Sequence, residues 1–67
     1  MKLDAYLSSE NIKEADFAAS IDCSQAHVNR LRRGKSFPSP KMIERIRRAT
    51  GEQVSFADWY TDLRKAG

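Results

Sequence analysis

The chain is 67 residues long, which suits one small domain over residues 1–67 and leaves little volume for a deep catalytic cleft. Its only cysteine, Cys23, excludes an intramolecular disulfide and fits a reducing cytoplasm. No stretch approaches the roughly 18 apolar residues of a membrane span, and Asp4 lies where a signal peptide would be apolar. Length and composition therefore predict a soluble, cytoplasmic protein without membrane association, and they favour binding over catalysis.

The net charge of +3 is unevenly distributed along the chain. Residues 30–48 hold eight basic residues and one acid, Glu44, which gives this stretch a charge of +7. The rest of the chain holds four basic and eight acidic residues, a charge of −4. Such an asymmetry within one domain indicates a surface that meets a polyanion. The alternative is a set of solvated helix faces.

Apolar spacing predicts two short helices at the start of the chain. Leu3 and Leu7 lie four residues apart, which gives a helix over residues 2–8 one apolar face. A second helix is expected over residues 13–21, although Lys13 is a poor N-cap because its side chain accepts no hydrogen bond. Helices this short are marginal in isolation, so each must pack against the rest of the domain.

The third expected helix, over residues 25–32, is polar and basic. Ser24 is a favourable N-cap for it, and Gly34 is placed to end it. Asp22 lies in the turn before it, where a left-handed backbone would favour glycine first and asparagine or aspartate next.

A capping serine followed by proline, Ser39-Pro40, predicts the start of a fourth helix, which Thr50-Gly51 would end. Its apolar stripe consists of Met42, Ile43, Ile46 and Ala49. Residues 52–54 could form a short extended piece, and Ser55 can cap a last helix over residues 56–63. Residues 64–67 are expected to fray.

The sequence therefore predicts an all-α fold of five short helices around one core, with a central helix-turn-helix. Phe37, in the loop before the fourth helix, is expected to plug this core. The predicted core consists of Leu3, Leu7, Ile12, Phe17, Ala18, Ile21, Val28, Leu31, Phe37, Ile43, Ile46 and Trp59.

Residues 13–33 carry a small residue, Ala18, a β-branched residue, Val28, and then Leu31 three positions later. With the Ser24 cap and the basic fourth helix, this stretch resembles the helix-turn-helix of the phage Cro and lambdoid repressor family. The resemblance implies a sequence-specific double-stranded DNA-binding transcriptional regulator of a phage or prophage, acting on the nucleoid of a bacterial or phage-infected cell. It also implies a homodimer on a palindromic operator, with residues 24–33 in the major groove.

The resemblance and the chemistry of base edges together select the candidate site residues. Gln and Asn can bond adenine bidentately, Arg can do the same with guanine, and Ala can contact a thymine methyl. The candidate base-contacting residues are Gln25, Ala26, His27, Asn29 and Arg30. The candidate phosphate-contacting residues, by the family's pattern, are Ser24, Arg33, Lys35 and Ser36. Each of them could instead be a solvated surface residue.

Two residues depart from the family's pattern. Glu14 stands where members commonly have a glutamine that contacts phosphate, and a carboxylate there would repel the DNA backbone. Asp22 replaces the usual turn glycine, which the backbone tolerates at some cost. We expect the fold to survive both changes and the contact at Glu14 to be absent or reorganised.

The dimer surface and the class of function each have an alternative. The apolar residues Val54, Phe56, Trp59 and Tyr60 are the candidate dimer surface, or they close the core of the monomer. The alternative function is a protein-interaction module that retains the helix-turn-helix fold, of the antitoxin or anti-repressor type.

Enzymatic, metal and cofactor functions are not expected. Cys23 and His27 lie four residues apart, but the chain has no further histidine or cysteine to complete a zinc site. Cys23 is better explained as a small apolar residue at the turn, and Ser24 as a cap. No glycine-rich phosphate loop or other small-molecule site is evident.

Overall fold

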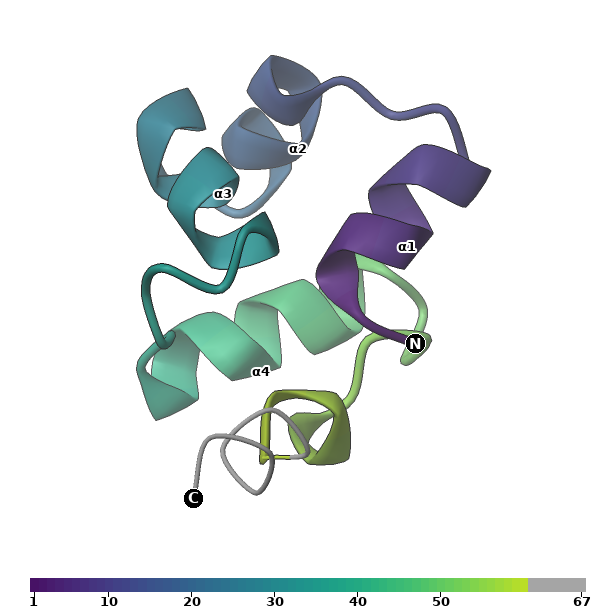
Figure 1. Cartoon of the computed structure of the whole chain (residues 1–67), viewed down its shortest axis with the longest axis vertical. Helices are drawn as coiled ribbons and strands as arrows, with labels where there is room; N and C mark the ends of the chain where they lie inside the picture. Colours follow the sequence, from purple (N-terminus) through teal and green to yellow (C-terminus); the bar gives the residue numbers. More distant parts are fainter. Residues whose placement is uncertain (61–67) are drawn as a thin grey trace.

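The computed structural model describes residues 1–60, and all regular secondary structure in this range is helical (Figure 1). The helices are α1 (Leu3–Ser9), α2 (Glu14–Ser20), α3 (Gln25–Arg32) and α4 (Pro40–Ala49), and residues 56–60 are also helical. The predicted all-α fold of five short helices is therefore confirmed. The predicted continuation of the last helix to residue 63 and the tail at residues 64–67 lie outside the described residues.

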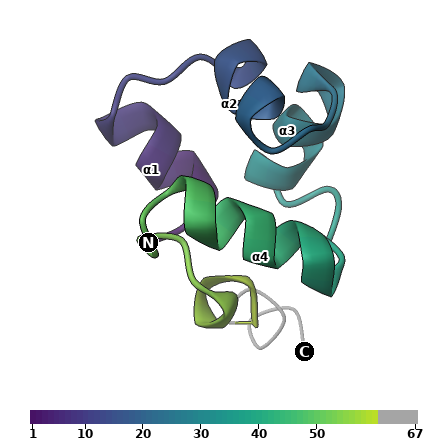
Figure 2. The same ribbon diagram turned by 180° about the vertical axis from the view of Figure 1, so that it is seen from behind.

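The helices α2 and α3 lie side by side, and α4 runs between this pair and residues 56–60 in both views of the chain (Figures 1 and 2). The helix α1 contacts α3 and stands beside one end of α4. The amino group of Met1 donates to the carbonyl of Gln53 at 2.9 Å and pairs with Asp58 at 2.7 Å. Within residues 1–60, no helix is long and apolar enough to cross a membrane.

The helices α1 to α4 all end in the same hydrogen-bonded turn. At the end of α2, the amide of Cys23 donates to the carbonyl of Ala18 at 3.0 Å, and the amide of Asp22 donates to that of Ala19 at 3.4 Å. These two bonds define a Schellman motif, which needs a left-handed residue directly after the C-cap of the helix. The residues that take this conformation in the four motifs are Asn11, Asp22, Gly34 and Gly51. The expected left-handed Asp22 and the stop at Gly34 are thereby confirmed.

The starts of α3 and α4 follow their capping residues. The Ser24 hydroxyl oxygen accepts from the amide of His27 at 3.1 Å, and that of Ser39 accepts from the amide of Met42 at 3.2 Å. Each cap satisfies an amide at the helix N-terminus that has no partner within the helix. Lys13 provides no side-chain cap to α2, as expected.

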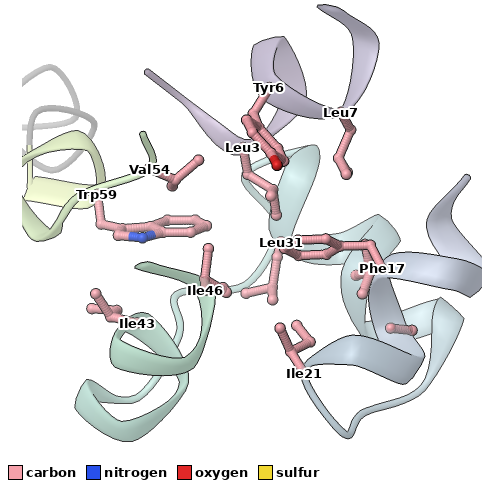
Figure 3. Close-up of a cluster of buried hydrophobic side chains, with 12 residues drawn as sticks. Leu3, Tyr6, Leu7, Phe17, Ile21, Leu31, Ile43, Ile46, Val54 and Trp59 are labelled. Carbon is pink, nitrogen blue, oxygen red and sulfur yellow. The ribbon is translucent and has the colours of Figure 1, made fainter. Parts of the chain in front are cut away.

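Side chains from every helix meet in one hydrophobic core (Figure 3). Its buried members are Leu3, Tyr6, Leu7, Phe17, Ala18, Ile21, Val28, Leu31, Ile43, Ile46, Val54 and Trp59. Ten of these twelve belong to the predicted core, which Tyr6 and Val54 join. The rings of Tyr6 and Phe17 lie 6.4 Å apart between centroids, a tilted aromatic contact. Ile12 was expected to be buried but is half-buried and packs at the edge of the core.

Three predictions on the second half of the chain are wrong. Phe37 does not plug the core: it is 49% exposed, and Pro38 is buried in its place. A residue before proline favours an extended backbone, in which neighbouring side chains point to opposite sides, so burial of Pro38 leaves Phe37 outside. Ala49, placed on the apolar stripe of α4, is exposed at the end of that helix. Residues 52–54 form a turn and a bend, because left-handed Gly51 and Glu52 redirect the chain there.

The candidate dimer surface divides into two parts. Val54 and Trp59 are buried in the core of the monomer, so they cannot form an exposed surface. Phe56 and Tyr60 are exposed, and the Tyr60 ring contacts that of Phe37 at a centroid distance of 5.8 Å.

Candidate nucleic-acid interface

The helix α3 is anchored to the domain by two apolar side chains. Val28 and Leu31 are buried, three residues apart, on the face that meets the core. A single apolar stripe of this kind leaves the remaining faces of the helix to polar residues. The helix α3 is therefore polar because only one of its faces packs against the core, and the opposite face is exposed to solvent.

The structure brings four of the five candidate base-contacting residues together. These four residues are Gln25, Ala26, Asn29 and Arg30. Together with Glu14 they line one shallow hollow on the surface. Of these four candidates, Gln25, Ala26 and Arg30 are exposed, and Asn29 is half-buried. His27, the fifth candidate, does not line this hollow; it is half-buried, and its position lies roughly on the other side of the helix from Gln25.

The candidate phosphate-contacting residues do not all lie together: two line a hollow and two do not. Arg33 and Lys35 are exposed and line a second hollow, which shares Glu14 and Asn29 with the first. Ser24 has its oxygen engaged as a helix cap, which leaves its hydroxyl hydrogen to donate elsewhere. Ser36 is half-buried in the loop after α3 and lines neither hollow.

Glu14 lines both hollows and contacts α3 directly. Its Oε2 atom accepts from the side-chain amide of Asn29 at 3.0 Å and from the Arg32 guanidinium at 3.2 Å. The bond from Asn29, followed by the interaction with Arg32, lowers the pKa of Glu14 against the opposing effect of burial. The carboxylate is thus ionised at neutral pH and compensated within the protein.

Arg32 connects α3 to two other helices. Its Nε atom donates to Asp4 at 2.8 Å and one terminal nitrogen donates to Ser8 at 3.3 Å, both on α1, while the other reaches Glu14. Burial opposes the positive charge, but the bonds to Asp4 and Glu14 outweigh it and raise the pKa of Arg32. Sequence reasoning missed this role, since residues 4, 14 and 32 are related only by the packing of three helices.

Part of the basic run is neutralised by acids on or beside α4. Glu44 pairs with Arg47 at 2.6 Å and with Arg48 at 3.1 Å, and these partners lower its pKa to about 2. Glu52 pairs with Arg47 at 3.0 Å. By contrast, no ion pair within residues 1–60 involves the exposed cations beside the hollows, which are Arg30, Arg33 and Lys35.

Cys23 and His27 are both half-buried, at the turn before α3 and in its first turn. Cys23 is half-buried against the core, and burial together with the nearby Asp22 raises the pKa of its thiol. Within the described part of the chain, no group of three or more histidine, cysteine or acidic residues could hold a metal ion.

The hollows thus combine amide donors and acceptors, a methyl group and cations that form no ion pair with residues 1–60 on one surface. Such a set can bond base edges and neutralise phosphates. Comparison with known proteins adds no relative: no protein-family model matches the chain, and no curated protein or solved structure does either.

Proposed function

We propose that the protein is a sequence-specific double-stranded DNA-binding transcriptional regulator that places α3 in the major groove. One observation carries the proposal: Gln25, Ala26, Asn29 and Arg30 line a common hollow on the side of α3 that is open to solvent. A B-DNA major groove admits one α-helix, and these side-chain types complement the edges of adenine, thymine and guanine. The resemblance of residues 13–33 to the Cro and lambdoid repressor family supports the same docking.

The distribution of charge supports DNA as the partner. Arg33 and Lys35 stand beside the expected base-contacting residues and can bond phosphates on one flank of the groove. The pairing of Glu44 with Arg47 and Arg48 leaves these two cations less able to bind phosphate. The cations near the end of α3 are therefore less offset by acids than Arg47 and Arg48, and a regulator of this kind would act on the bacterial nucleoid.

We further propose that the protein binds as a homodimer through Phe37, Phe56 and Tyr60. One helix reads only a few base pairs, and two-fold symmetric dimers solve this by binding half-sites about one helical turn apart. These three aromatic side chains are exposed in the monomer, and two of them already contact each other. Exposed aromatic clusters are enriched at protein interfaces.

Substitution of Arg30 tests the docking of α3. After bound sequences have been selected from a random duplex library, Arg30→Ala and Arg48→Ala should be titrated on the selected operator and on a scrambled duplex. Arg30→Ala should weaken operator binding about tenfold or more and scrambled binding much less, because a bidentate arginine–guanine contact contributes about 1–3 kcal/mol of discrimination.

Arg48→Ala is the matched control, since Arg48 is exposed and paired with Glu44. Arg48→Ala should weaken binding to the operator and to the scrambled duplex slightly and by the same factor. An equal loss on both duplexes for Arg30→Ala would make Arg30 a phosphate contact and contradict the proposed docking.

A further inference from the structure

Among the acids of residues 1–60, Glu14 is the one that lines both hollows of the candidate interface. It is the first residue of α2, and its carboxylate reaches across to the fifth residue of α3, Asn29. The side chain is only 18% exposed, so it does not extend freely toward solvent. The family resemblance implies a phosphate contact at this position, and Glu14 instead bonds Asn29 and Arg32 within the protein.

The contact with Glu14 determines which way the amide of Asn29 points. An ionised carboxylate only accepts hydrogen bonds, so Asn29 must turn its NH₂ group toward Glu14 and its oxygen away. The NH₂ group has two hydrogens, and one bond to Glu14 at 3.0 Å uses one of them. The proposed arrangement has Glu14 bound to the hydrogen that points away from the amide oxygen, so that the other hydrogen and the oxygen lie side by side as one donor and one acceptor.

That pair of atoms is complementary to one base edge in the major groove. Adenine presents an acceptor at N7 next to a donor at N6, and asparagine bonds both at once. An asparagine free to flip its amide would have to lose this freedom on binding, at a cost in entropy. The bond to Glu14 removes that freedom before DNA arrives.

The position of the pair places it within reach of a docked duplex. Asn29 lines the hollow that contains Gln25, Ala26 and Arg30, and also the hollow that contains Arg33 and Lys35. It therefore lies between the candidate base-reading residues and the candidate phosphate-binding cations. A base contacted by Asn29 would stand next to the DNA backbone on one flank of α3.

Resting on the DNA-binding function proposed above, we propose that Glu14 is a positioning residue that makes Asn29 select adenine in each half-site. Glu14 itself contacts no base in this arrangement. It fixes the orientation of the Asn29 amide, while its bond to Arg32 keeps the carboxylate in place. The residue at the start of α2 would thus contribute to sequence choice without contacting a base.

Selection from a random duplex library tests this role through base preference, which a merely structural residue would not change at a single position. The wild type should enrich adenine at one position of each half-site. Glu14→Ala should lose that preference about tenfold and change the other positions less, with the largest of these smaller changes at the position read by Gln25, which also interacts with Glu14. Glu14→Gln should keep it, because the glutamine oxygen can accept the same hydrogen bond from Asn29.

Two further variants serve as controls. Asp16→Ala removes the same charge from the first turn of α2, where its side chain is exposed, and should leave the adenine preference intact. Asn29→Ala should lose the same adenine position as Glu14→Ala. Circular dichroism and Trp59 fluorescence establish that each variant is folded.

Several outcomes would overturn the proposal. Adenine preference that persists in Glu14→Ala or in Asn29→Ala would show that another residue reads the base. Loss of the preference in Glu14→Gln as well would assign the effect to charge, and loss of a cytosine position in both Glu14 variants would make Glu14 a direct reader. A wild type that enriches no sequence would overturn the DNA-binding function together with this role.

Discussion

Two arginines of α3, two residues apart, have different surroundings and therefore different expected roles. Arg32 has a side chain that is 19% exposed and is bonded to Asp4, Ser8 and Glu14. Arg30 is exposed and has no ion pair within the described residues. Removing a partner from a partly buried ionic network leaves the remaining charges poorly compensated. Arg32 should therefore contribute to stability, and Arg30 to binding.

Arg32→Ala should lower the free energy of unfolding by about 1–2 kcal/mol, because Asp4 and Glu14 lose their shared donor. Urea denaturation followed by the fluorescence of Trp59, the only tryptophan, measures this directly. The matched control, Arg30→Ala, should change stability by no more than about 0.5 kcal/mol. Equal effects of the two substitutions would contradict the role assigned to Arg32.

At the scale of elements, the ends of the helices follow from local sequence. Ser24 and Ser39 are capping residues, and Gly34 and Gly51 accept the left-handed backbone at low cost. Such signals act within a few residues, which is why the bounds of α3 could be predicted from sequence. Asp22 could be assigned to the turn for the same reason.

The ion pairs on α4 predict a dependence of stability on acid pH. Arg47 and Arg48 lower the pKa of Glu44 from its ordinary 4.5 to about 2. A lowered pKa contributes stability above the ordinary value, and this contribution is lost as the pH falls from about 4.5 toward about 2. Glu44→Gln should therefore be less stable than the wild type at pH 6 and equally stable near pH 2.

Urea denaturation at several pH values checks this prediction. Glu10→Gln is the control, since Glu10 is exposed and takes part in no ion pair of the described residues. The difference in free energy of unfolding between Glu10→Gln and the wild type should not change between pH 4.5 and pH 2 in the way expected for Glu44→Gln. A difference for Glu44→Gln that stays constant from pH 6 to pH 2 would show that the ion pairs contribute no stability.

At the scale of the whole molecule, the sequence predicted what depends on periodicity and missed what depends on packing between distant segments. The apolar faces of the helices, such as Val28 and Leu31 on α3, follow from spacing alone. The exposure of Phe37 depends on which of two neighbouring loop residues enters the core. The bonds from Glu14 to α3 depend on how two helices lie side by side, and no local pattern encodes them.

The exposed aromatic residues Phe37, Phe56 and Tyr60 predict that the protein is a homodimer. Phe37 and Tyr60 are 49% and 46% exposed, so the double variant Phe37→Ser, Tyr60→Ser should stay folded. It should sediment as a monomer, and its operator titration should change from second to first order in protein concentration. Lys41→Ser, an exposed substitution at the start of α4, should leave the dimer intact. A wild type that sediments as a monomer and binds its operator with first-order dependence would contradict the dimer.

The central claim is that residues of α3 read a DNA sequence, and one comparison of affinities tests it most directly. The wild-type protein should be titrated on its selected operator and on a scrambled duplex of the same length and composition, at a fixed salt concentration of about 0.1 M. We predict that the operator binds at least about 1,000-fold more tightly, the lower end for specific regulators. Equal affinity for both duplexes would contradict sequence reading, and no binding to either duplex even at low salt would favour a protein-interaction module instead.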